Sequence, residues 1–123
     1  MLEISINPVF LDEQSIPEES IFLWAYHIKI TNKFGQPIVI KRRNFEAFDA
    51  FGQKQVIESN QMVNLEPRIE VDGFFEYASG VLLTAPSGFF SGEYEVLLED
   101  GSSVVQKIPS FSLDSHYDCP KVH

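Results

Sequence analysis

The stretch FLWAYHIKITN, residues 22–32, shows most directly what kind of fold this chain adopts. Its large apolar side chains occupy every second position, and smaller or polar side chains lie between them. A period of two is typical of a β-strand that buries one face in a core. The following NKFGQP, residues 32–37, contains Asn, Gly and Pro, which favour a turn, and IVIKRRNFEAF is predicted to be the next strand.

The same pattern recurs on both sides of this stretch. Further strands are predicted in LEISINPVFL, KQVIE, FFEYAS, GEYEVLLED and SSVVQKIPSFSL, and Asp100-Gly101 is a strong hairpin signal. No segment has the apolar spacing of a helix. About seven short antiparallel strands within residues 1–114 predict one all-β domain, a β-sandwich or alternatively a closed barrel. Residues 115–123 lose the alternation and are predicted to form a loosely ordered tail.

Charge and cysteine content restrict the partners and the compartment. The chain has 123 residues and a formal net charge of −9, with 9 basic residues against 18 acidic ones. Binding to nucleic acid depends on Lys and Arg that neutralise phosphates, so a cation or a basic protein is a better partner than nucleic acid. A single cysteine, the lack of a signal peptide and the lack of a membrane-length apolar run predict a cytoplasmic protein without membrane insertion.

The segment TAPSGFFSGEYEV, residues 84–96, places two Ser-Gly pairs around two phenylalanines. No helix follows it, and neither does a Lys-Ser or Lys-Thr pair, so it lacks the parts of a phosphate-binding loop. Pro86, Gly88 and Gly92 are predicted instead to shape a turn or a bulge ahead of a strand.

A protein-contact surface is predicted from apolar residues that the alternation does not bury. Phe89 and Phe90 are adjacent, so they cannot both face the core of an extended segment, and one of them is predicted to be exposed. Met62 and Val63 lie in a predicted loop. Exposed Phe and Met are enriched in interfaces, so a partner protein or a second copy of the chain is expected to cover them.

Metal-binding residue types gather in the tail, which contains His116, Asp118, Cys119 and His123. These types suit zinc, nickel or cobalt. The segment is terminal and no second cluster completes a site, so an incidental polar tail is the favoured interpretation. His27 is likewise predicted to be a partly exposed strand residue rather than a ligand.

The sequence gives even less support for a catalytic site than for a metal site, so no reaction and no cofactor are predicted. Glu93 and Glu95 share one face of a predicted strand, which indicates a solvated outer surface rather than a pair of glycosidase carboxylates. Lys41, Arg42 and Arg43 form the only basic run, and they are expected to pair with the abundant acids rather than bind nucleic acid.

Three segments in order, NPVFLDEQSIPEES, FEYASGVLLTAPSGFFSGEYEV and IPSFSL, resemble the bacterial ApaG family over roughly residues 2 to 113. The resemblance implies an immunoglobulin-like or fibronectin-III-like sandwich. It also implies an association with divalent-cation (cobalt and magnesium) homeostasis, without an established reaction. Similar domains of eukaryotic proteins are attached to F-box and polymerase-interacting proteins, which suggests protein binding.

The chain departs from the family at a glycine loop of the form G-x-G-V-V-G-x-x-P. Ser59, Gln61 and Asn64 stand where the family has glycines, and phosphate cradling by backbone N–H groups often needs the positive φ that glycine permits. The family's R-H-W segment reads Arg43-Asn44-Phe45, which removes an ionisable His. The prediction is therefore a non-enzymatic protein-binding module, and the alternative is a protein of the same fold that binds a metal, pyrophosphate or a dinucleoside polyphosphate.

Overall fold

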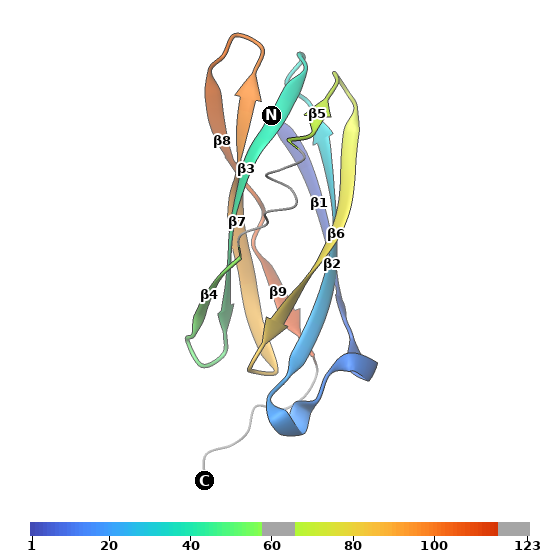
Figure 1. The fold of residues 1–123 in the computed structure, drawn as a ribbon, viewed down its shortest axis with the longest axis vertical. Helices are drawn as coiled ribbons and strands as arrows, with labels where there is room; N and C mark the ends of the chain where they lie inside the picture. Colours follow the sequence, from blue (N-terminus) through green and yellow to red (C-terminus); the bar gives the residue numbers. More distant parts are fainter. Residues whose placement is uncertain (58–65, 116–123) are drawn as a thin grey trace.

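Two antiparallel β-sheets packed face to face make up the structure (Figure 1). This computed structural model describes residues 1–57 and 66–115. The strands are β1 (Leu2–Phe10), β2 (Phe22–Asn32), β3 (Ile38–Asp49), β4 (Lys54–Ile57), β5 (Arg68–Ile69), β6 (Phe74–Leu83), β7 (Ser87–Leu98), β8 (Ser103–Lys107) and β9 (Phe111–Asp114). One sheet has the order β1-β2-β6, and the other has the order β4-β3-β7-β8, with β5 also paired to β3 and β9 to β7. The predicted all-β sandwich is therefore confirmed.

The described residues contain nine strands rather than about seven, because one predicted strand divides and the two-residue strand β5 is not predicted. SSVVQKIPSFSL forms β8 and β9, which pair with residues 93–97 and 87–90 of β7, respectively. The break includes Pro109, which has no N–H to donate to a ladder. The predicted hairpin between β7 and β8 is confirmed, with Gly101 at a φ of +89° and the Leu98 N–H donating to the Ser102 carbonyl at 2.8 Å.

Between β1 and β2 the chain makes two short helical turns, η1 (Asp12–Gln14) and η2 (Pro17–Glu19). They occupy the segment that reads as a polar connection in the sequence. Within residues 1–57 and 66–115, no helix is long and apolar enough to cross a membrane.

Two glycines of the TAPSGFFSGEYEV segment have a different role from the predicted one. Only residues 84–86 form the connection, and Gly88 and Gly92 lie inside β7, opposite β3. A Cβ atom at Gly88 would collide with the Phe48 carbonyl oxygen, and one at Gly92 would lie 2.5 Å from the Asn44 carbonyl oxygen and against the Phe45 ring. Glycine is needed here because two strands and a buried ring approach closely, and not because the chain turns.

A β-bulge in β3 changes which residues of the basic run face the interior. The pairing between β3 and β7 shifts register between Ile40 and Arg42. Ile40 is buried on one side of the shift, and Arg43 and Phe45 are buried on the other, whereas Arg42 is exposed. An extra residue in one strand re-aims the side chains that follow it. The bulge therefore directs the last member of the basic run into the sandwich.

The core lies between the sheets and contains the alternate apolar residues that the sequence predicts for β2. The cluster of buried hydrophobic side chains consists of Leu2, Phe22, Trp24, Tyr26, Ile28, Ile30, Ile38, Ile40, Phe45, Ala47, Ile69, Val81, Leu83, Phe90, Tyr94, Val96, Ile108 and Leu113. Ser115, which the sequence places in a loose tail, is also buried, and its N–H and Oγ donate to the Pro86 carbonyl at 3.0 and 2.6 Å. Ser115 therefore packs against the connection before β7, and the other residues of the predicted tail, 116–123, lie outside the described part.

Candidate functional site

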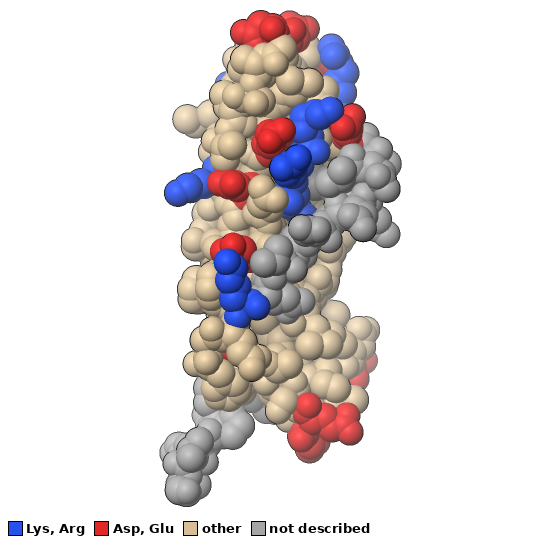
Figure 2. Space-filling view, turned by 60° about the vertical axis from the view of Figure 1, so that its left-hand side comes forward, with Lys and Arg blue, Asp and Glu red and all other residues tan. Residues whose placement is uncertain are grey.

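Two phenylalanines form an exposed aromatic pair on the outer face of β3 and β7. Phe48 and Phe89 are directly opposite in register, with ring centroids 5.1 Å apart and an interplanar angle of 17°. The Phe89 residue is 48% exposed, and Phe51 in the turn after β3 is 55% exposed. In Figure 2, acidic and basic side chains alternate over much of this side of the molecule, and few charges lie on its lower part. The aromatic pair, Phe48 and Phe89, is therefore an exposed apolar feature on this outer face.

The prediction that only one of two adjacent phenylalanines is exposed is confirmed. Phe90 is fully buried, and its ring contacts those of Tyr26, Phe45 and Phe111 at centroid distances of 4.9–5.2 Å. The prediction that Phe90 contacts a partner is wrong, because its side chain is buried in the core. Only Phe89 of the two presents a surface.

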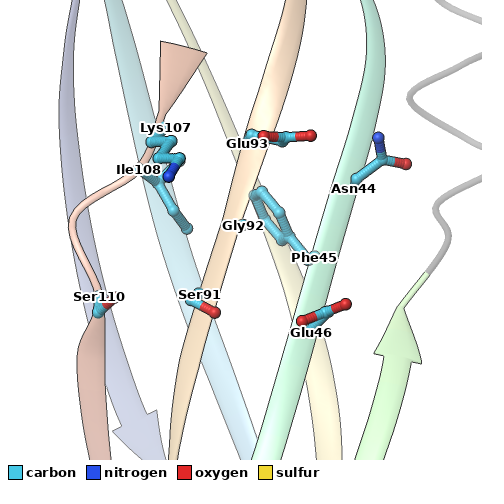
Figure 3. Close-up of a pocket in the computed structure, with 9 residues that line it drawn as sticks. All are labelled: Asn44, Phe45, Glu46, Ser91, Gly92, Glu93, Lys107, Ile108 and Ser110. Carbon is cyan, nitrogen blue, oxygen red and sulfur yellow. The ribbon is translucent and has the colours of Figure 1, made fainter. Parts of the chain in front are cut away.

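A hollow of about 560 Å³ lies on the same face, beside the aromatic pair (Figure 3). It exists because the strand next to β7 changes from β8 to β9, so residues 91–92 have no strand partner on that side. One backbone bond, from the Ile108 N–H to the Gly92 carbonyl at 3.0 Å, holds the connection in place. The hollow is lined by Asn44, Phe45, Glu46, Ser91, Gly92, Glu93, Lys107, Ile108 and Ser110. Buried Phe45 and Ile108 provide its apolar lining, and two carboxylates and one ammonium group provide its charge.

A second unusual feature lies inside the sandwich, where Arg43 is only 3% exposed. Its Nη1 donates to the hydroxyls of Tyr26 and Tyr77 at 3.2 and 3.3 Å, and the hydroxyls of Tyr77 and Tyr94 are 2.5 Å apart. Its Nε has no hydrogen-bond partner. The guanidinium also lies over the Phe45 ring, 4.9 Å from the centroid. We call Arg43, Tyr26, Tyr77 and Tyr94 the Arg–Tyr cluster.

The charge of this cluster is not balanced by the described part of the chain. No carboxylate of residues 1–57 or 66–115 lies within 4.0 Å of the Arg43 guanidinium. Lys41 pairs with Glu66 at 2.7 Å, as expected of the basic run, but the same expectation is wrong for Arg43. Burial raises the pKa of both Tyr94 and Tyr77, although the Arg43 charge acts in the opposite direction. Both hydroxyls therefore remain protonated at neutral pH, and neither supplies a negative charge.

Of the remaining candidate residues, some lie on the outer surface and the others lie outside the described residues. His27 is exposed, as predicted, and its Nε2 lies 3.0 Å from Glu76 Oε2. Glu93 and Glu95 lie on the outer face of β7, partly buried. The loop positions Ser59, Gln61, Met62, Val63 and Asn64 and the tail residues His116, Asp118, Cys119 and His123 lie outside the described residues. Elsewhere in the described chain, no group of three His, Cys, Asp or Glu side chains could hold a metal ion.

Comparison with known proteins agrees with the fold. The ApaG domain model matches residues 12–98. The chain belongs to the ApaG family. A Protein ApaG of Paramagnetospirillum magneticum is 37% identical over 122 residues, covering 99% of this chain and 94% of the relative. A Protein ApaG of Maricaulis maris is 41% identical over 117 residues, covering 95% and 90%.

Solved structures extend the similarity to three dimensions. The crystal structure of a putative ApaA protein from Bordetella pertussis matches with a TM-score of 0.89 and 28% identity, covering 96% of both chains. A protein from Archaeoglobus fulgidus, with a TM-score of 0.51 and 8% identity, shares the fold alone. The sandwich is thus the common structure of this ApaG chain and its relatives.

Proposed function

We propose that this chain is a non-enzymatic binding module that docks another protein on the outer face of β3 and β7. The observation that carries this proposal is the aromatic pair, in which Phe89 is 48% exposed and stacked on Phe48. Aromatic side chains are enriched in protein interfaces, and their exposure on a free surface reduces solubility. Phe51 adds a further exposed ring in the turn that follows β3.

The hollow and the charge indicate what the partner must present. Glu46 precedes Phe48 by two residues and Ser91 follows Phe89 by two, so the hollow continues directly from the aromatic pair on the same face. A pocket next to exposed aromatics is a common place for an interface anchor. The chain has a formal net charge of −9, and Glu93 lines the hollow together with Lys107 and Glu46, which pairs with Lys54. The partner we propose therefore has an apolar anchor surrounded by basic side chains.

In this proposal the family's association with cobalt and magnesium belongs to the partner and not to a metal on this chain. Docking on the outer face requires no ion. Calorimetry with cobalt, magnesium and diadenosine tetraphosphate checks this point, because a stoichiometric response to any of the three would favour the alternative of a small-ligand or metal-binding protein.

The direct test compares two exposed phenylalanines on opposite sheets. Phe89→Ser removes half of the aromatic pair, and Phe74→Ser is the matched control because Phe74 is 59% exposed on β6. Proteins captured from the native cell extract by the unmodified chain are identified, purified and titrated against all three forms. Sedimentation of each form measures self-association in the same way. Phe89→Ser is expected to weaken binding by about 1 to 4 kcal/mol with little change in the thermal melt, and Phe74→Ser to have no effect on binding.

Equal binding by the two variants would show that the outer face of β3 and β7 is not the docking surface. A lower melting temperature for Phe89→Ser alone would show that this ring contributes to folding, and the docking proposal would then lose its main support.

A further inference from the structure

Arg43 carries a buried positive charge that no carboxylate of the described residues balances. An isolated charge in a protein interior is costly, and a buried ion without a counter-ion destabilises the fold. Arginine cannot avoid this cost by losing its proton, because a guanidinium stays protonated in proteins. The nearest groups are neutral hydroxyls and aromatic rings. A bound anion that is not part of the protein would balance the charge.

The geometry of the guanidinium shows which edge is available. Nη1 is occupied by Tyr26 and Tyr77, whereas Nε has no partner. The Nε–H of a guanidinium points to the same side as Nη2, away from Nη1, so these two nitrogens form one planar edge. Such an edge binds the two oxygens of a carboxylate or phosphate through parallel hydrogen bonds.

The tyrosines add hydroxyl protons without a described acceptor. The Tyr26 hydroxyl accepts from Arg43, and its own proton has no acceptor among residues 1–57 and 66–115. Tyr77 and Tyr94 share one proton in the bond between their hydroxyls, which leaves the second without a described acceptor. The Arg–Tyr cluster therefore has more donors than acceptors, as an anion-binding site requires.

The fold fixes the position of Arg43 between the two sheets. The bulge in β3 aims Arg43 inward, and bulges are frequent next to functional sites. Residues 40–44 of β3 lie between the stretches that pair with β5, at 38–39, and with β4, at 45–48. Tyr77 is partly buried on β6, which is the edge strand of its sheet. Arg43 thus lies where the described β3 has no second strand partner, and its Nη1 reaches Tyr77 on the edge strand of the opposite sheet.

We propose that the Nε–Nη2 edge of Arg43 binds a small oxyanion, such as inorganic phosphate or a free carboxylate. The hydroxyls of Tyr26 and Tyr77 hold Nη1 and so orient the guanidinium for the anion. This site lies on the inner face of β3 and is separate from the outer docking surface. It goes beyond the proposed function, because an oxyanion here would regulate or complete the fold without contacting Phe89.

The side-chain Nε–H signals of the ¹⁵N-labelled full chain test the proposal directly. The chain has three arginines, so Arg42 and Arg68 serve as internal controls in the same spectrum. Sodium phosphate and sodium acetate are added in separate titrations, with the ionic strength held constant by sodium chloride. We expect a saturable shift of the Arg43 Nε–H signal with at least one oxyanion, together with a melting temperature that rises with its concentration.

Two variants separate oxyanion binding from a general effect of charge. Arg43→Lys keeps the positive charge but loses the planar edge, and it should weaken the apparent affinity at least tenfold, whereas Arg42→Lys should leave it unchanged. A response to both oxyanions would indicate any carboxylate or phosphate, and a response to phosphate alone would identify phosphate. The proposal is overturned if the Arg43 signal moves no more than the other two, or if chloride alone produces the same shift. If Arg43→Lys fails to fold, the titration of the unmodified chain still decides.

Discussion

A sandwich usually has polar side chains on its outer faces and apolar ones inside, and β3 and β7 depart from this pattern on both faces. On the outer face, Phe48 and Phe89 stack in contact with solvent, and on the inner face Arg43 lies beside buried Tyr94. Exposed rings cost little stability but favour association, whereas an interior charge costs stability unless another group compensates it. Changes on the inner face should therefore affect folding, and changes on the outer face should affect binding.

The largest expected difference is between two neighbours in sequence. Phe90→Ala empties a site packed by Tyr26, Phe45 and Phe111 and should lower the free energy of unfolding by about 3 to 5 kcal/mol. Phe89→Ala removes an exposed ring and should change it by less than about 1 kcal/mol. Urea unfolding of both variants measures the contrast, and similar losses would mean that both rings belong to the core.

Adding a single methyl group to the inner face should have the next largest effect. Gly92→Ala places a Cβ against the Asn44 carbonyl and the Phe45 ring, and should lower the free energy of unfolding by about 3 kcal/mol. Gly80→Ala is the matched control in β6, where the added Cβ would lie 3.3 Å from the Trp24 carbonyl oxygen. A chemical denaturation series should show a clearly smaller loss for this control. Equal losses would show that β-propensity, and not the close approach of β3 and β7, determines the effect.

Alkaline pH should lower the free energy of unfolding, because two tyrosines on the inner face are buried. Burial raises the pKa of Tyr94 and Tyr77 above the value of about 10 that the unfolded chain has. Above about pH 10 the unfolded state loses protons that the folded state keeps, so the contribution of these tyrosines to stability is constant below this pH and falls above it, by about 1.4 kcal/mol per pH unit and tyrosine. Urea unfolding at a series of alkaline pH values should show this slope, and Tyr94→Phe should reduce it. A slope identical in the variant would mean that Tyr94 does not contribute.

The smallest effect is expected for a charge on the outer face. Lys54 and Glu46 form an ion pair of 2.9 Å, but both side chains are well exposed to solvent. Lys54→Ala should change the free energy of unfolding by less than about 1 kcal/mol, and less still at high salt. Thermal melts at low and high salt provide the measurement. A loss of several kcal/mol would contradict the contrast between interior and surface charges.

Much of the fold can be predicted because the relevant signal is local. Each strand of a sandwich alternates between core and solvent, so the apolar period of β2 indicates its buried face without any knowledge of its neighbours. The same argument predicts that Phe89 and Phe90 face opposite sides. It does not say which one is buried, because that depends on where β7 begins and how it pairs with β3.

Local sequence patterns are sufficient to predict the all-β class, the main strands, the hairpin at Gly101 and the exposure of one ring in the Phe89-Phe90 pair. Three features depend on strand pairing: Phe89 is the exposed ring, Gly88 and Gly92 lie where two strands approach closely, and Arg43 points inward. The physical reason is that alternation and turn chemistry act over a few residues. Register, bulges and close approach arise between strands that are distant in the chain, and the side chains that explain them belong to the partner strand.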